Sequence, residues 1–97
     1  MKALVFSEKS LDDLHSILEY ISRDKPEAAI RFIESLEDQC VSLDAFPGIG
    51  ARRDDLAEDL RLFSFRGYAI YYRELSDKVR VERVLRGAID VKTLHFE

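Results

Sequence analysis

The sequence LRLFSFRGYAIYYRELSDKVRVERVLR at positions 60–86 predicts a β-sheet. Aromatic and β-branched residues, which favour strands, fall there into three runs: Leu60–Phe65, Tyr68–Glu74 and Val79–Arg86. The connections Arg66-Gly67 and Leu75–Lys78 are short enough for hairpins, so the three strands are expected to pair antiparallel. Residues 68–72 are apolar without alternation, which predicts a central strand with both faces covered.

An amphipathic helix is predicted upstream of these strands, from about Glu8 to Arg23. Ser7 is a candidate N-cap, because its hydroxyl can accept a hydrogen bond from an unpaired backbone N–H. The apolar residues of this segment recur at spacings of three and four, as on one face of a helix: Leu11, Leu14, Leu18 and Ile21, with Ile17 beside them.

A second amphipathic helix is expected to begin at Pro26, since the first helical position needs no N–H donor. It should end near Pro47, after about 20 residues. Because only a few residues separate the two helices, we expect them to pack antiparallel as a hairpin. The apolar stripe of the second helix consists of Ala29, Ile33, Leu36, Cys40 and Leu43.

The expected order of elements is β-α-α-β-β-β, with a short first strand at Lys2–Phe6. We expect an α+β fold in which the N-terminal helical hairpin packs on one face of an antiparallel sheet. A chain of 97 residues has the size of one domain, so residues 1–97 are predicted to form one. Residues 52–59 are polar and are expected to be irregular. The tail Ala88–Glu97 fits either a loop or one helical turn at Val91 and Leu94.

The composition is typical of a globular protein, with 46% apolar and 35% charged residues. No apolar run approaches the roughly 18 residues of a membrane-spanning helix, and the N-terminus does not resemble a signal peptide. The single cysteine favours a cytoplasmic location. A net charge of −4 argues against general binding to nucleic acids.

Positive charge is concentrated in the second half of the chain. Residues 1–51 contain five basic and ten acidic side chains, whereas residues 52–97 contain ten basic and nine acidic ones. The arginines there are interleaved with aromatic residues, a combination that can bind phosphates and stack on bases. They can equally protect strand edges from aggregation, so composition alone leaves both roles open. These arginines are Arg61, Arg66, Arg73, Arg80, Arg83 and Arg86.

No catalytic or metal-binding constellation is recognisable. Cys40 falls within the stripe of the second helix, where a cysteine behaves as a small hydrophobe, and His15 is expected to be packed or solvated. Two histidines and one cysteine lack the spacing of metal ligands. The glycines at Gly48 and Gly50 lack the Lys-Ser/Thr pair of a phosphate-binding loop. We therefore expect no catalytic residue, no metal and no cofactor.

A longer pattern runs through most of the chain: Asp13-Leu14, Ile17, Tyr20-Ile21, Pro26, Ala28-Ala29, Phe32-Ile33, Leu36, Leu43, Phe46-Pro47, Gly50, Leu60-Arg61, Tyr68, Tyr72-Arg73, Val84-Leu85-Arg86-Gly87 and Asp90. In order and spacing it resembles the ParE/RelE superfamily of bacterial toxins, and the ParE branch most. The resemblance extends from about Leu4 to Asp90. The fold of that superfamily has the order of elements expected above.

The resemblance implies the toxin of a type II toxin–antitoxin pair, the kind of system that serves plasmid stabilisation. It also implies a ParD-like antitoxin whose disordered C-terminal segment folds as it binds the toxin. ParE-like members poison DNA gyrase by stalling it on cleaved DNA. RelE-like members cut mRNA in the ribosome.

The residues favour gyrase as the target, with no catalysis by the toxin itself. RelE-like nucleases carry basic residues on the second strand and after the last strand, where this chain has Leu62–Phe65 and Ala88-Ile89. Apolar side chains cannot stabilise a charged transition state. One alternative is a ribosome-dependent endoribonuclease. Another is an attenuated toxin that only binds its antitoxin, since arginine is missing after Gly87. The nuclease would use Arg61, Arg66, Arg86 and His95.

The antitoxin is expected to contact both halves of the chain. Its acidic residues should meet arginines of the predicted sheet, and its amphipathic helix should lie on the apolar surface of the helical hairpin. Neither a membrane nor a specific nucleic-acid sequence is an expected partner. The predicted antitoxin contacts are Arg61, Arg73, Arg83, Arg86, Leu14 and Leu18.

Overall fold

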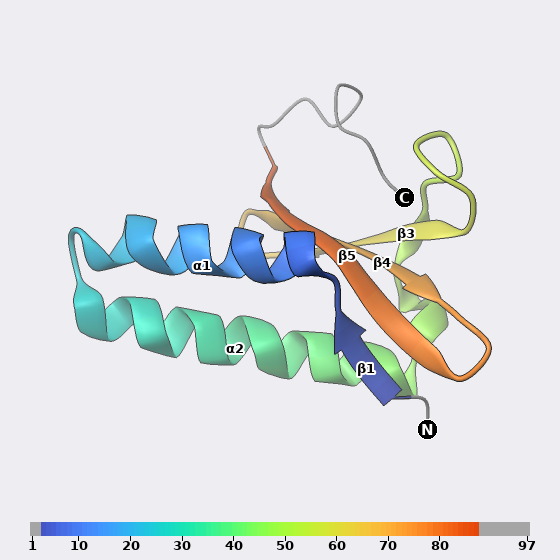
Figure 1. Ribbon diagram of the computed structural model, residues 1–97, viewed down its shortest axis with the longest axis horizontal. Coiled ribbons are helices and arrows are strands. Elements are labelled where there is room, and N and C mark those ends of the chain that lie inside the picture. The colour runs from blue at the N-terminus through green and yellow to red at the C-terminus, as the bar shows by residue number, and fades with distance from the viewer. Residues whose placement is uncertain (1–2, 88–97) are drawn as a thin grey trace.

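A computed structural model describes residues 3–87. Two helices lie side by side against a five-stranded sheet with the strand order β1-β5-β4-β3-β2 (Figure 1). In chain order the elements are β1 (Ala3–Phe6), α1 (Glu8–Ser22), α2 (Pro26–Ala45), the 3₁₀ helix η1 (Pro47–Ile49), β2 (Ala51–Arg52), β3 (Leu60–Phe65), β4 (Tyr68–Glu74) and β5 (Lys78–Arg86). The predicted α+β fold with an N-terminal helical hairpin is therefore confirmed.

The sheet is mixed, and its first strand accounts for the difference from the predicted antiparallel sheet. Strands β2 to β5 pair antiparallel in succession, whereas β1 pairs parallel with β5 and sets Ala3 beside Lys78. A strand of four apolar residues carries no signal for its direction, because its partner lies more than 70 positions further along the chain. Antiparallel pairing is predictable only where a short turn joins two strands.

Residues 52–59, which were predicted to be irregular, begin with one strand residue, Arg52. Arg52 pairs with Arg61, and Ala51 with Leu62, so β2 forms one edge of the sheet. Two residues are too few to show a strand pattern in the sequence. The remaining residues, 53–59, form a loop that begins at β2 and returns to β3.

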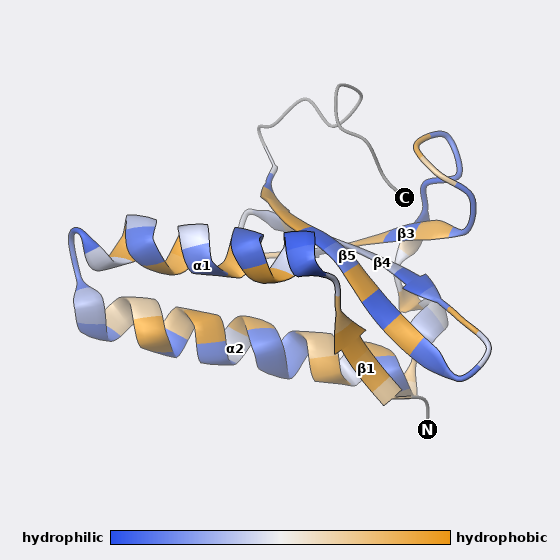
Figure 2. Ribbon diagram, in the orientation of Figure 1, coloured by the Kyte–Doolittle hydropathy of each residue, from blue (hydrophilic) through white to orange (hydrophobic). Residues whose placement is uncertain are grey.

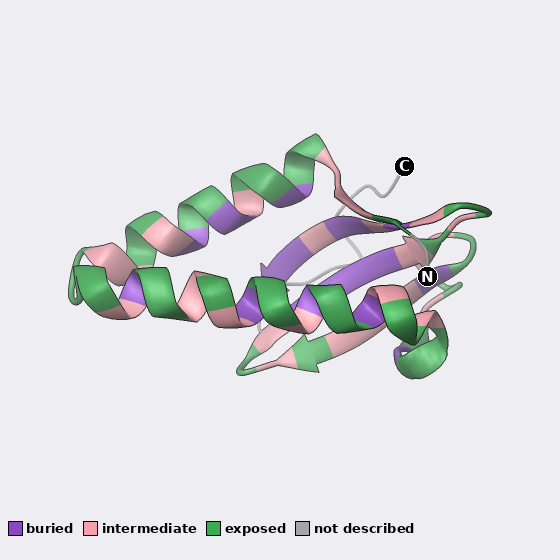
Figure 3. Cartoon of the chain, turned by 90° about the horizontal axis from the view of Figure 1, so that it is seen from below, coloured by how far each residue is buried: buried purple, intermediate pink, exposed green. Residues whose placement is uncertain are grey.

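The main core lies between the helical hairpin and the sheet. The predicted stripe of α2 is buried at Ala29, Leu36, Cys40 and Leu43, each with no exposed surface, and Ile33 is half-buried. The sheet contributes five fully or almost fully buried residues to this core, namely Ile70, Tyr72, Val79, Val81 and Val84. Polar and apolar residues alternate along the first part of β5, from Lys78 to Glu82 (Figure 2). The outward sides of both helices are exposed (Figure 3).

A smaller core covers the opposite face of the sheet. Leu60, Ala69, Tyr71 and Leu85 are buried there, and Leu56 in the loop between β2 and β3 packs against them. Since Ala69 to Tyr72 are all buried, the prediction that β4 is central and covered on both faces is confirmed.

The buried face of α1 differs from the predicted stripe by one position. Ser10, Leu14 and Ile17 are buried and Ile21 is half-buried, whereas Leu11 is 52% exposed. Ser10 can occupy the core because its hydroxyl donates a hydrogen bond to the Ser7 carbonyl at 2.8 Å. Ser7 is the predicted N-cap, and its hydroxyl oxygen accepts the Ser10 N–H at 3.1 Å.

Candidate functional site

A groove of about 200 Å³ lies between α1 and the last part of β5. Its lining is mostly apolar, and it includes two tyrosines and the charged residues Asp13 and Arg86. α1 contributes Asp13, Ile17 and Tyr20, and the sheet contributes Tyr68, Val84 and Arg86.

The groove exists because β1 is shorter than β5. β1 ends at Phe6, opposite Val81, so the part of β5 after Val81 has no neighbouring strand on that side. The chain turns at Ser7 into α1, which runs beside this uncovered edge of β5 (Figure 1). A helix cannot approach a strand as closely as a second strand does, and the space between them remains open.

Residues at the start of α1 and just before it form hydrogen bonds with the backbone groups of this edge. Ser7 donates its N–H to the Val81 carbonyl at 3.0 Å and its hydroxyl to the Glu82 carbonyl at 2.8 Å. Asp13 accepts the backbone N–H of Val84 at 2.9 Å. The edge of β5 is thus closed to strand addition as far as Val84.

A β-bulge at Glu82 directs two charged side chains of β5 to different partners. Tyr72 pairs with Val81 and Tyr71 with Arg83, so Glu82 has no residue opposite it. The Glu82 carboxylate lies between two guanidinium groups, accepting bonds from Arg73 at 3.1 Å and from Arg80 at 2.9 and 3.1 Å.

Arg83, the residue after the bulge, forms a two-bonded ion pair with Asp13 of α1 at 2.8 and 2.9 Å. The two side chains are only 18% and 13% exposed. Hydrogen bonding to Asp13 raises the pKa of Arg83 above its usual range. Asp13 therefore holds α1 against β5 through both the Arg83 side chain and the Val84 backbone.

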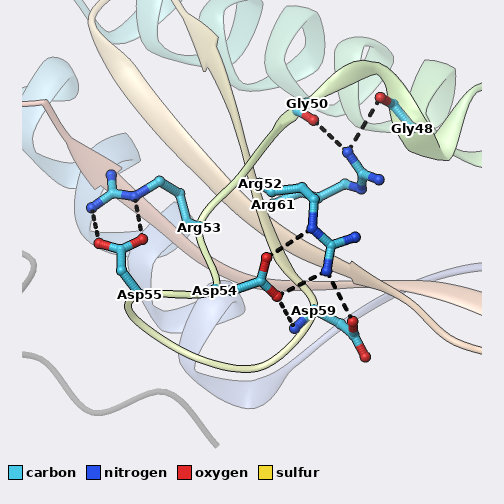
Figure 4. A network of polar contacts seen from close by, with 8 residues as sticks. All are labelled: Gly48, Gly50, Arg52, Arg53, Asp54, Asp55, Asp59 and Arg61. Carbon is cyan, nitrogen blue, oxygen red and sulfur yellow. Dashed lines mark hydrogen bonds and ion pairs between the residues drawn. The ribbon is translucent and has the colours of Figure 1, made fainter.

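At the other side of the sheet, Arg61 is bonded to backbone carbonyls (Figure 4). Its Nη1 donates to the carbonyl of Gly50 at 2.8 Å and to that of Gly48 at 3.4 Å. Tyr72 reaches the same segment from the core, where its hydroxyl donates to the Pro47 carbonyl at 2.7 Å and accepts the Gly50 N–H at 2.8 Å. Arg61 and Tyr72 together fix the chain after α2.

The loop between β2 and β3 pairs its own charges (Figure 4). Arg52 donates to Asp54 at 2.7 and 2.9 Å and to Asp59 at 3.3 Å, and Arg53 donates to Asp55 at 2.9 Å. The hydrogen bonds to Arg52 are the main reason that the pKa of the exposed Asp54 lies below its ordinary value.

Arg66 and Arg86 differ from these arginines because each lies over an aromatic ring. The guanidinium carbon of Arg66 is 5.0 Å from the centroid of the Phe65 ring, and that of Arg86 is 5.5 Å from the centroid of the Tyr20 ring. Both side chains belong to exposed residues, and neither has a carboxylate partner within residues 3–87.

The predicted antitoxin contacts do not gather in one patch. Arg86 lines the groove and Arg83 lies beside it, but Arg61 and Arg73 are bonded elsewhere on the sheet. Leu14 is buried in the core and Leu18 is half-buried on α1. No local pattern in the sequence pairs Asp13 with β5, because Asp13 and Arg83 are 70 positions apart.

The residues of the nuclease alternative are also dispersed. Arg66 and Arg86 lie at the same end of the sheet, where Gly87 donates its N–H to the Gly67 carbonyl at 2.9 Å. Arg61 is at the opposite end of β3, about 17 Å away along a strand of this length. His95, Ala88 and Ile89 lie outside the described residues.

Cys40 and His15 are placed as the sequence predicted. Burial raises the pKa of the Cys40 thiol to about 12, so it is protonated at physiological pH. The His15 side chain is 72% exposed and lies 3.4 Å from Glu19.

Between residues 3 and 87, no group of three or more His, Cys, Asp or Glu side chains is arranged to hold a metal ion. The same part of the chain contains no helix with the length and apolarity needed to cross a membrane.

Comparisons with known proteins agree with the resemblance seen in the sequence. A solved structure of the chromosomal ParDE TA system from P. aeruginosa contains a chain that superposes with a TM-score of 0.78 and is 20% identical. The similarity covers 89% of this chain and 96% of the other, and at this identity it shows a common fold. No curated protein matches the chain. Residues 4–91 match the family described as ParE toxin of type II toxin-antitoxin system, parDE, and the chain therefore belongs to the ParE toxin family.

Proposed function

We propose that this ParE family member poisons DNA gyrase and is neutralised by a ParD-like antitoxin, part of which occupies the groove between α1 and β5. The groove carries the antitoxin part of the proposal, since it is mostly apolar, is also lined by the charged residues Asp13 and Arg86, and is of the size that apolar side chains fill. An amphipathic segment is the kind of ligand that such a groove binds. The toxin would act in the cytoplasm, where gyrase is found.

Arg86 is the predicted antitoxin contact that the geometry supports best, because it lines the groove and is exposed. Arg83 would act indirectly, by holding α1 in place through Asp13. Leu14 and Leu18 would contribute through the packing of α1. Arg61 and Arg73 are bonded to other parts of the chain, and we propose no antitoxin contact for them.

Poisoning of gyrase requires no catalytic residue in the toxin. A protein that stalls gyrase on cleaved DNA acts by binding one state of the enzyme more tightly than the others. In agreement with this, Cys40 is buried and protonated. Arg73 and Arg80 of the sheet are bonded to Glu82, and Arg83 is bonded to Asp13 of α1.

Expression without the antitoxin tests the target. We expect the DNA-damage response and filamentation to appear while bulk translation continues. In vitro, the purified chain should inhibit supercoiling by gyrase and cause cleaved linear DNA to accumulate in the presence of ATP. Cleavage of mRNA that depends on ribosomes, with gyrase unaffected, would contradict the proposal.

An endoribonuclease is the second candidate, favoured by the exposed cations Arg66 and Arg86 at one end of the sheet. It predicts that translation stops first and that mRNA is cut at defined codon positions. Inactivity toward both targets would indicate an attenuated toxin. In that case the variants Ala88→Arg and Ile89→Arg test whether the missing arginine restores activity.

A further inference from the structure

Two arginines in the second half of the chain have neither a carboxylate nor a carbonyl partner among residues 3–87. Positions 52–86 contain eight arginines. Arg52, Arg53, Arg73, Arg80 and Arg83 are bonded to carboxylates, and Arg61 to carbonyls. Within residues 3–87, only Arg66 and Arg86 of the eight have neither kind of partner, and each lies over an aromatic ring. A guanidinium in this position keeps its N–H donors free for an anion.

These two arginines flank a group of aromatic side chains at one end of the sheet. Phe65 pairs with Tyr68 across β3 and β4, and Tyr68 pairs with Arg86 across β4 and β5. Phe32 of α2 packs on both aromatic neighbours, with ring centroids 6.0 Å from Phe65 and 5.3 Å from Tyr68. Because Phe65 and Arg86 are two strands apart, their backbones are separated by roughly 10 Å.

The backbone conformation of the turn does not favour an arginine at position 66. Arg66 and Gly67 form the two-residue connection between β3 and β4 with φ angles of 47° and 85°. Two positive φ angles define a turn that prefers Asn, Asp or Gly at its first position. An arginine there is strained, and strain of this kind is concentrated at functional sites.

We propose that Arg66 and Arg86 bind two carboxylates of an acidic, amphipathic antitoxin segment, whose apolar side chains cover the aromatic group and enter the groove. This inference rests on the proposed function, because it assigns the charged contacts of the same site. Charge complementarity favours an acidic occupant, because two exposed cations flank the partly buried aromatic group and one of them, Arg86, also lines the groove. Positions seven residues apart on a helix are about 10 Å apart, similar to the backbone separation of Arg86 and Phe65, the residue before Arg66.

The experiment measures the affinity of the purified chain for its antitoxin, produced as a full-length protein from the neighbouring reading frame. Calorimetric titrations at low and high ionic strength compare the wild type with Arg66→Gln, Arg86→Gln and the double variant. Each single variant should bind about tenfold more weakly at low salt, the effect of one charge-assisted hydrogen bond. The differences should shrink at high salt, since exposed charges are screened.

Two further variants separate binding from folding. Lys9→Gln removes one exposed positive charge from the first turn of α1 and should leave the affinity unchanged. Arg66→Asn replaces the strained residue with one that suits the turn, so it should raise the denaturation midpoint while weakening antitoxin binding. A more stable variant that binds less well cannot be explained by misfolding.

Equal affinities for the wild type, Arg66→Gln and Arg86→Gln would overturn this inference and leave the proposed function standing. The inference is also overturned if these variants keep their antitoxin affinity but lose binding to a single-stranded oligouridine, because the cations would then serve RNA. Absence of antitoxin binding by the wild type would overturn the inference and the antitoxin part of the proposed function together.

Discussion

Among the four glycines, Gly50 is the one with least room for a side chain. A Cβ atom placed there would lie 2.6 Å from the Tyr72 hydroxyl and 2.8 Å from the Leu62 carbonyl oxygen. The close approach allows Tyr72 to bond to both the Gly50 N–H and the Pro47 carbonyl. The absence of a side chain at Gly50 is therefore what lets the segment after α2 lie against β3.

Substitution of this glycine should destabilise the protein. Gly50→Ala forces the backbone away from Tyr72 and Leu62, and it weakens the bond between the buried hydroxyl and the Gly50 N–H. We expect the free energy of unfolding to fall by about 1–3 kcal/mol, measured by urea denaturation. Gly48→Ala is the matched control, because a Cβ there meets nothing within 4 Å. Equal midpoints for the two variants would contradict this role for Gly50.

Cys40 should react with thiol reagents only when the protein unfolds. Its side chain is completely buried and its pKa is raised to about 12, so the native state holds the unreactive thiol. Since the pKa in the unfolded chain is lower, the contribution of this thiol to stability is complete below about pH 9 and is lost as the pH rises toward 12. Labelling in native buffer that is as fast as in denaturant would show the burial of Cys40 to be wrong.

Helix α1 is attached to the sheet through Asp13, whose carboxylate contacts both the Arg83 guanidinium and the Val84 N–H. Asp13→Asn leaves Arg83 without its partner in a mostly buried position, which should lower the free energy of unfolding by about 3 kcal/mol. Asp12→Asn, at an exposed neighbouring position, is the control and should change little. A double-mutant cycle with Arg83→Gln measures the coupling, and additivity would contradict the ion pair.

Helix α2 depends on Leu36 for its packing, since this side chain is completely buried in the main core. Leu36→Ala should reduce the free energy of unfolding by about 2–5 kcal/mol, through lost burial and the cavity it leaves. Leu11→Ala is a suitable comparison, because Leu11 is 52% exposed and its truncation should cost little. Denaturant midpoints that do not differ would place Leu36 outside the core.

For the whole molecule, the sequence predicts those features that depend on neighbouring residues. The stripe through Leu36 and Cys40 predicted α2, and the runs of aromatic and β-branched residues predicted β3 and β4 to the residue. These patterns are local, because hydrogen bonds within a helix and turns within a hairpin join residues close in the chain.

Features that join distant parts of the chain were not predictable. Ser10 is buried in place of the more hydrophobic Leu11 because the start of α1 is fixed to β5 through Ser7. The contacts of Asp13 and the parallel pairing of β1 have partners 70 or more positions away. For the same reason, arginines that look alike in the sequence differ in the fold: Arg83 is paired, whereas Arg86 has no carboxylate partner among the described residues.

The pairing of β1 with β5 also determines when the fold can be completed during synthesis of the chain. Ser7 is made early, but the Glu82 carbonyl that it binds follows 75 positions later. Translation proceeds from the N-terminus at roughly 5–20 residues per second, so the helical hairpin emerges from the ribosome seconds before β5 does. Until then Leu14 and Leu36 have no sheet to cover them, and the groove lacks one of its walls. A nascent chain therefore has a complete groove only after β5 has left the ribosome and packed beside α1.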